Sequence, residues 1–226
     1  MVSVPPPERI PVQADQGAGH IASTVRLLKA SSPHILVEVL TPDFRGEHAC
    51  IDEVALAGLD GEARLVHPAA PRNGAGDASP HPHAVYAHNV ETVERLQGRI
   101  RDHRAGWRQS LAVLQRAKVV APSLLTKTSI MLGLGETLED VREAMRGIRD
   151  AGVDVITFGQ YLRPSKRHVA LDRYVTPEEF ASLQADAEAL GFLYVASGPL
   201  VRSSYKAGEY FLEGLLKKRA EQAAGR

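Results

Sequence analysis

Short apolar runs alternate along this chain with longer segments in which apolar residues recur at helical spacing. Most of the apolar runs are rich in Val, Ile or Phe, as strands buried on both faces of a parallel sheet are. They cover residues 34–40, 85–88, 125–132, 153–159 and 192–197. We therefore expect an α/β fold in which parallel strands, joined by helices, form a sheet or a barrel.

Three of the intervening segments carry an apolar stripe that is typical of a half-buried helix. The stripes are Ile21, Val25 and Leu28, then Leu138, Val141, Met145 and Ile148, then Phe180, Leu183, Ala187 and Leu190. Thr176, Pro177 and Glu179 supply an N-cap, a first-turn proline and a capping-box carboxylate. Thr137 with Asp140 repeats this start signal, and Gly191 predicts the end of the last helix.

One segment, residues 61–84, interrupts the alternation of expected strands and helices. It is rich in proline and glycine, and its apolar residues show neither helical nor strand periodicity. An ordered loop of this length inside a compact domain is uncommon. Two interpretations remain open: a disordered surface insertion, or translated non-coding sequence such as a retained intron. His67, His81 and His83 lie inside the segment, but without a third ordered ligand we expect no metal site there. Residues 1–14 are expected to be disordered, and residues 219–226 to form a flexible tail.

Charge and composition exclude some classes of function. Among the 226 residues, Lys and Arg total 27, as do Asp and Glu, so broad binding to nucleic acid or to an anionic membrane is not expected. No apolar run approaches the length of a transmembrane helix. Cys50 is the one cysteine, and the chain therefore forms no internal disulfide.

The motif that most narrows the function is Arg202-Ser203-Ser204-Tyr205, which follows the last expected strand. Together with other short motifs in the same order, it resembles the lipoyl synthases, which are radical S-adenosylmethionine (SAM) enzymes. The other stretches that carry this resemblance are residues 15–20, 38–44, 88–92, 126–136, 159–162 and 174–177.

The resemblance implies a fold, a reaction and a set of partners. The fold is a partial (β/α) barrel of the radical SAM type, with residues 15–218 forming its C-terminal part and an N-terminal truncation that removes the first strand. The reaction inserts sulfur at C6 and C8 of an octanoyl chain on a protein lysine. The implied carriers are the lipoyl-carrier domains of 2-oxoacid dehydrogenase complexes or the glycine cleavage H protein, and the electron donor is of the ferredoxin type. The amino-acid sequence of residues 157–168 and 205–211 resembles the plastid branch of the family more than the mitochondrial branch.

The implied cofactors are SAM and two four-iron, four-sulfur clusters. The cofactor-binding positions that the resemblance indicates are Glu38, Asn89, Glu91, Ser129, Gln160, Tyr161 and Leu162. Simpler explanations stay open for several of them. Glu38, in an apolar run, also suits an internal ion pair with Lys127, and Asn89 also suits a helix N-cap. His88 also suits a structural role at a strand end.

The resemblance makes Ser204 an oxygen ligand of the auxiliary cluster, and each cluster needs three cysteines besides. Cys50 lies in an expected helix with no second cysteine nearby, and it is interpreted as a small, partly buried apolar residue. We therefore expect this chain alone to assemble neither cluster and to be inactive. The alternative function is that of a non-catalytic protein that binds an octanoylated or lipoylated carrier domain.

A basic loop follows the fourth expected strand. It contains Arg163, Lys166, Arg167 and His168. Such a loop suits contact with an acidic carrier domain, although a solvated charged loop is the more common explanation.

Overall fold

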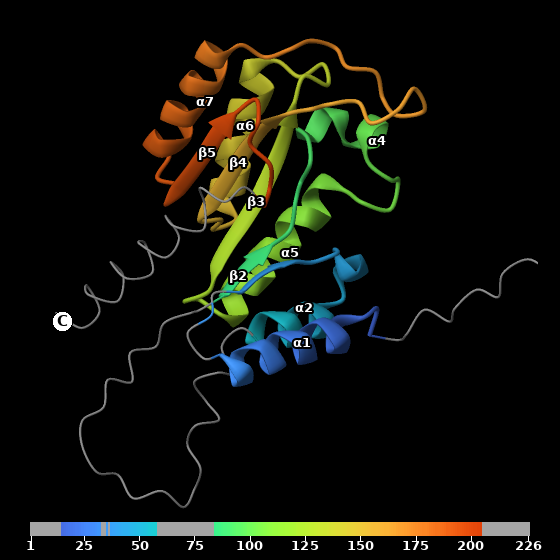
Figure 1. Cartoon of the computed structure of the whole chain (residues 1–226), viewed down its shortest axis with the longest axis vertical. Helices are drawn as coiled ribbons and strands as arrows, with labels where there is room; N and C mark the ends of the chain where they lie inside the picture. Colours follow the sequence, from blue (N-terminus) through green and yellow to red (C-terminus); the bar gives the residue numbers. More distant parts are fainter. Residues whose placement is uncertain (1–14, 33–34, 36, 58–83, 205–226) are drawn as a thin grey trace, which may run out of the picture.

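The computed structural model describes residues 15–32, 35, 37–57 and 84–204. Its centre is a five-stranded parallel sheet in which each strand pairs with the next along the chain (Figure 1). The strands are β1 (Val37–Leu40), β2 (Ala84–Ala87), β3 (Leu125–Leu132), β4 (Val155–Gln160) and β5 (Tyr194–Gly198). This order confirms the expected α/β fold and agrees with a partial radical SAM barrel.

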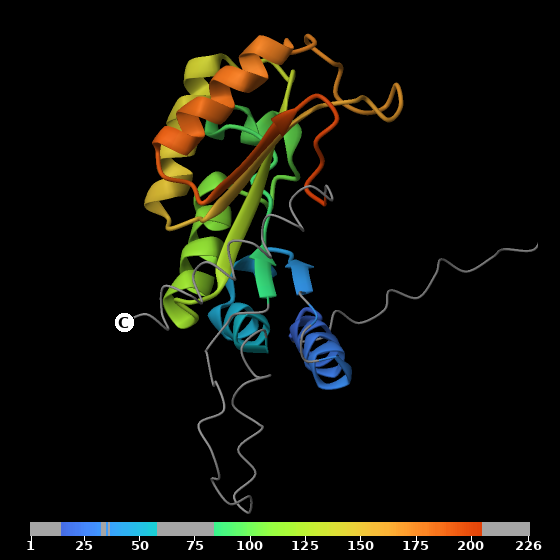
Figure 2. The ribbon, with the colours of Figure 1, turned by 60° about the vertical axis from the view of Figure 1, so that its left-hand side comes forward.

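Helical segments connect the strands, because parallel neighbours need a crossover. They are α1 (Ala18–Ser31), η1 (Phe44–Gly46), α2 (His48–Ala57), η2 (Glu94–Leu96), α4 (Gln97–Ile100), α5 (Trp107–Val120), α6 (Leu138–Asp150) and α7 (Pro177–Ala189). Figure 2 shows α5, α6 and α7 along one face of the sheet, which we call the helical face. The opposite face is called the inner face.

The start signals of the two C-terminal helices are confirmed. Thr137 caps α6 and Thr176 caps α7, and in both helices the N3 carboxylate bonds back to the N-cap N–H. Such a capping box satisfies two N–H groups that the first turn leaves without partners. Gly191 follows α7 with φ of 83°, a left-handed conformation that glycine adopts without strain.

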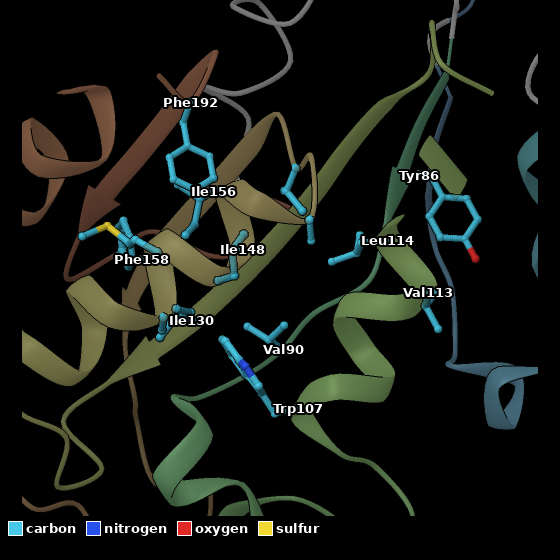
Figure 3. Close-up of a cluster of buried hydrophobic side chains, with 14 of the residues drawn as sticks. Tyr86, Val90, Trp107, Val113, Leu114, Ile130, Ile148, Ile156, Phe158 and Phe192 are labelled. Carbon is cyan, nitrogen blue, oxygen red and sulfur yellow. The ribbon is translucent and has the colours of Figure 1, made fainter. Parts of the chain in front are cut away.

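The main core lies between the helical face and the helices. Alternate residues of the strands, such as Ile130 and Phe158, meet Trp107 and Ile148 from the helices (Figure 3). Burial of one such large side chain stabilises the fold by about 1.5–3 kcal/mol. A smaller cluster of Val85, Leu125 and Val155 lies on the inner face.

The prediction that the first strand is buried on both faces is wrong for β1. Val37 is buried, but Glu38 is exposed and Leu40 keeps 57% of its surface in solvent. The reason is position: within the part of the chain described here, β1 pairs only with β2 and forms an edge of the sheet. Of the expected strand 34–40, the described part is β1 at Val37–Leu40, and positions 34 and 36 lie outside the described residues.

Several expectations concern segments that lie partly or wholly outside the described residues. Ala84, assigned from the sequence to the insertion, belongs to β2, whereas residues 61–83 lie outside the described residues. The same holds for the expected disordered N-terminus, residues 1–14, and for the expected flexible tail, residues 219–226. Among the helices that are described, none is long and apolar enough to cross a membrane.

Candidate functional site

The carboxyl end of the sheet gathers most of the polar side chains that the sequence indicated. In parallel sheets the loops after successive strands meet at this edge, which is where ligands bind in open α/β folds. Glu91, after β2, donates its N–H to the Ser129 carbonyl at 3.0 Å and accepts from the Met131 N–H at 2.9 Å. These two bonds continue the pairing of β2 with β3 beyond the regular strand and set Glu91 opposite Ile130, the residue next to Ser129.

Glu91 is strained and partly desolvated. Its φ of 65° is left-handed, a conformation that costs a non-glycine residue roughly 1–3 kcal/mol and is often found at functional sites. Burial raises the pKa of the Glu91 carboxyl, while a hydrogen bond from Asn89 and the charge of Arg101 oppose the shift. A carboxylate held in this way is a strong hydrogen-bond acceptor for a cationic or hydroxyl-bearing ligand.

Asn89 has an unsatisfied buried atom. No helix begins at this residue, since η2 starts at Glu94 with Val93 as its N-cap, so the capping explanation is wrong. The Asn89 Oδ1 atom is buried and has no partner, which costs about 1–3 kcal/mol. Such an atom points to a ligand donor that completes the site.

Two hydroxyl residues lie side by side on the inner face. Ser129 of β3 is directly opposite Thr157 of β4, and both are nearly buried. The Thr157 Oγ1 atom is likewise buried without a partner, as are the hydroxyl oxygens of Tyr86 and Thr92. Sequence reasoning missed Thr157, because its place beside Ser129 depends on the register of two strands.

Glu38 forms the ion pair with Lys127 that the sequence offered as the simpler explanation of this residue. Its carboxylate accepts two hydrogen bonds from Lys127 Nζ, at 2.8 and 2.6 Å. Lys127 is buried on β3, and its side chain reaches over the small Ala87 of β2 to the edge strand. A carboxylate has about four lone-pair sites, so the pair leaves Glu38 able to accept from a ligand as well.

The glycine turn after β3 satisfies its own backbone. The carboxylate of Glu136 accepts from the N–H of Gly133 at 2.5 Å and from that of Leu134 at 2.9 Å. Gly133 and Gly135 have φ of 95° and 106°, which confirms the tight left-handed turn. Since Glu136 occupies these donors, the turn does not offer a phosphate cradle.

The stretch after β4 combines structural and accessible groups. The Gln160 side chain bonds the carbonyls of Leu132 and Tyr161 and accepts from Val175 N–H. The Tyr161 hydroxyl donates to the Val169 carbonyl at 2.9 Å. Both side chains are therefore committed to the fold, while Leu162 is half exposed.

A buried network supports the loops after β1 and β2. His88 Nδ1 lies 2.9 Å from the Thr41 carbonyl, and its Nε2 lies 3.0 Å from the Ser110 hydroxyl. Arg101 donates to the same hydroxyl at 2.8 Å, so the neutral ring donates through Nδ1 and accepts at Nε2. Burial lowers the pKa of His88. The structural explanation of His88 is thus confirmed, and Arg101 and Ser110 are members that the sequence did not reveal.

The segment after β5 folds over the end of β4. The backbone of Val201 passes so close to Gly159 that a Cβ there would collide with the Val201 carbonyl. Arg202 donates to that carbonyl at 2.7 Å. Ser203 and Ser204 follow in a turn, with Ser204 exposed, and Tyr205 lies beyond the described residues.

The described side chains do not fit an iron–sulfur cluster. No group of three His, Cys, Asp or Glu side chains that could hold a metal occurs among them. Cys50 is buried in α2, where its Sγ donates to the Asp15 carbonyl at 3.3 Å. Burial and nearby carboxylates raise the pKa of its thiol, opposite to what a thiolate ligand needs.

Comparison with known proteins places this arrangement in context. No protein-family model matches the chain. It is 56% identical over 208 residues to a Phytophthora infestans protein named "Lipoyl synthase, mitochondrial". Proteins of the same name from Aedes aegypti and Picea sitchensis are 50% identical to it over 212 and 211 residues.

These alignments cover 92%, 94% and 93% of this chain but 48% of each relative. The chain thus spans about half the length of the curated relatives it matches. The names of these relatives give no support to the expected plastid form.

Proposed function

Because this chain is a lipoyl synthase homologue, we propose that it supplies the SAM-binding edge of an enzyme that inserts sulfur at C6 and C8 of a protein-bound octanoyl group. The observation that carries the proposal is the 56% identity over 92% of the chain. The unsatisfied buried Asn89 Oδ1 at the carboxyl end of the sheet supports it.

The residues at this edge suit the chemistry of SAM. We propose that Asn89 Oδ1 and the Glu91 carboxylate accept from its amino or ribose groups, with Ser129 beside them. Glu38 contributes its remaining lone pairs from the inner face. For the stretch from Gln160 to Leu162 we propose backbone contact with the adenine, since the Gln160 and Tyr161 side chains are already used. When bound and reduced, SAM supplies the means to remove hydrogen from the octanoyl chain.

The thiolates of both clusters have to come from outside these 226 residues, because Cys50 is the one cysteine and it is buried. We propose that Ser204 serves as a cluster ligand only when those thiolates are present, since a hydroxyl is a weak ligand for iron on its own. On this proposal the chain alone is inactive.

The proposed setting is the mitochondrion, as in the names of the relatives. The proposed protein partners are an octanoylated carrier domain, from a 2-oxoacid dehydrogenase complex or the glycine cleavage H protein, and a ferredoxin-type electron donor. The neutral net charge of the chain gives no reason to propose nucleic acid as a partner.

A chimaera tests this function. The part of the Phytophthora infestans relative that precedes the alignment is joined to this chain, and lipoyl product is measured on an octanoylated carrier. We expect product from the chimaera and none from this chain alone. The Asn89→Ala chimaera should bind SAM about tenfold more weakly, the loss expected for about one hydrogen bond to a charged group. The matched control is Arg108→Ala, an exposed change on α5.

Two outcomes would reject the proposal. A folded chimaera that yields no product would remove the enzymatic role and favour the alternative, a protein that binds acylated carriers without chemistry. Unchanged SAM affinity in the Asn89→Ala chimaera would move the SAM site away from this edge.

A further inference from the structure

The loop after β4 concentrates positive charge on a chain that has none overall. Arg163, Lys166 and Arg167 are exposed, and none of them forms an ion pair within the described part of the structure. Asp172 is the one acidic residue between Tyr161 and Thr176. Acidic and basic residues balance over the whole chain. The loop therefore carries a local excess of positive charge that the overall composition does not explain.

The loop is braced from within. Arg163 donates to the His168 carbonyl at 2.9 Å and also to the Lys166 carbonyl. The Ser165 hydroxyl lies 2.9 Å from His168 Nδ1, and the Tyr161 hydroxyl holds the far end of the loop at Val169. The side chains of Lys166 and Arg167 take no part in this bracing. They are therefore presented by an ordered backbone, which lowers the entropic cost of binding a partner.

The loop lies at the functional edge of the sheet. It projects from the carboxyl end of β4, and the segment with Ser204 leaves the neighbouring β5 (Figure 1). Two large apolar residues are exposed at the same strand ends: Leu162 keeps 50% of its surface in solvent and Leu200 keeps 75%. The segments that follow β4 and β5 thus expose both apolar and basic side chains.

We propose that Leu162, Leu200, Lys166 and Arg167 form a docking surface for an acidic patch of the protein that carries the acyl-lysine. The inference rests on the proposed function, because that function makes the substrate part of a protein surface. Charge complementarity supplies steering and orientation, and the exposed leucines add apolar contact area. Exposed apolar side chains beside the charges favour a protein partner over a nucleic acid, whose contacts are chiefly with phosphates.

Three synthetic peptides test the proposal. Each carries the same octanoyl-lysine, flanked by glutamates, by serines or by lysines, and binding to the 226-residue chain is followed by fluorescence anisotropy. We expect the acidic peptide to bind about tenfold more tightly than the neutral one at low salt, and the advantage to fade as salt rises. The lysine-flanked peptide should bind most weakly.

A pair of matched charge reversals locates the surface. Lys166→Glu with Arg167→Glu should abolish the preference for the acidic peptide. Arg108→Glu with Arg146→Glu makes the same change of charge on exposed positions of α5 and α6 and should leave the preference intact. Arg163 is left unchanged, because its side chain braces the loop.

Each result separates the docking surface from the proposed function. Equal binding of the acidic peptide and of a fourth peptide, identical except for an unmodified lysine, would count against the proposed function while leaving the docking surface in place. Equal effects of the two charge reversals would overturn the docking surface. Binding of a single-stranded RNA oligomer or of phosphatidylserine vesicles as tightly as the acidic peptide would overturn the assignment to a protein partner.

Discussion

Lys127 Nζ lies 2.6 Å from Glu38 Oε2, and the two residues come from strands that are not neighbours. The side chain of Lys127 keeps 5% of its surface in solvent and that of Glu38 keeps 32%. The two ends of the ion pair therefore differ: the ammonium depends on its partner for solvation, whereas the carboxylate still reaches water. The pair joins the edge strand β1 to the centre of the sheet.

This asymmetry predicts unequal costs of mutation. Glu38→Gln leaves a buried ammonium without its counter-charge, and the free energy of unfolding should fall by about 2–4 kcal/mol, somewhat less than for a fully buried pair. Lys127→Met leaves an accessible carboxylate and should cost about 1 kcal/mol. The double variant should recover most of the loss, as measured by urea denaturation. Equal losses in the two single variants would contradict this account.

Gly159 is predicted to seat the segment that carries Ser204. Gly159→Ala introduces a methyl group into the Val201 carbonyl and should displace residues 199–204, with a loss of about 1–3 kcal/mol. The measurement is the rate of tryptic cleavage at Arg202, which should rise. Gly198→Ala is the matched control, because its Cβ would meet only Val201 Cγ2 at 3.5 Å. Similar cleavage rates in both variants would show that Gly159 does not hold the segment.

His88 predicts a loss of stability in mild acid. Its pKa is lowered in the folded protein from a value of 6.5, so the unfolded chain binds more protons below that pH. The stabilisation is present above about pH 6.5 and is lost as the pH falls, by up to about 1.4 kcal/mol per pH unit. His88→Asn retains a donor to Thr41 but does not titrate, and it should flatten this slope in chemical denaturation.

The pKa of the Glu91 carboxyl is shifted in the opposite direction to that of His88, so a Glu91 variant serves as the comparison for the His88 variant. Its pKa is raised by burial, so the folded protein binds more protons, and the contribution is lost as the pH rises through the folded pKa. Glu91→Gln should therefore remove a contribution that opposes the one from His88, so that stability falls more steeply on acidification, and it should not lower stability at neutral pH. An unaltered slope in His88→Asn would show that another group titrates.

Much of the fold could be predicted because its signals are local. Thr137 and Thr176 cap their helices through hydrogen bonds to residues only three positions further along the chain. The apolar runs assigned to β3, β4 and β5 match the strand bounds within two residues. Helix α5 was not predicted, although Trp107, Val113, Leu114 and Ala117 share its buried face; its polar Ser110 interrupts that apolar stripe and belongs to the His88 network.

The site was harder to predict because its contacts depend on register. The sequence indicates Ser129 but not Thr157, since only the pairing of β3 with β4 sets them side by side. The environment of Glu38 likewise depends on β1 lying at an edge, which an apolar run does not reveal. The assignment of SAM to Asn89, Glu91 and Ser129, and of a cluster to Ser204, stays a prediction.

We propose above that these 226 residues carry the SAM-binding edge of a lipoyl synthase without the thiolates that its clusters need. The most direct measurement is the iron and acid-labile sulfide bound by the chain after anaerobic reconstitution, beside the chimaera with the cysteine-bearing segment. We expect background levels of iron and sulfide for the chain and bound cluster for the chimaera. Near-stoichiometric iron and sulfide on the chain alone would contradict it.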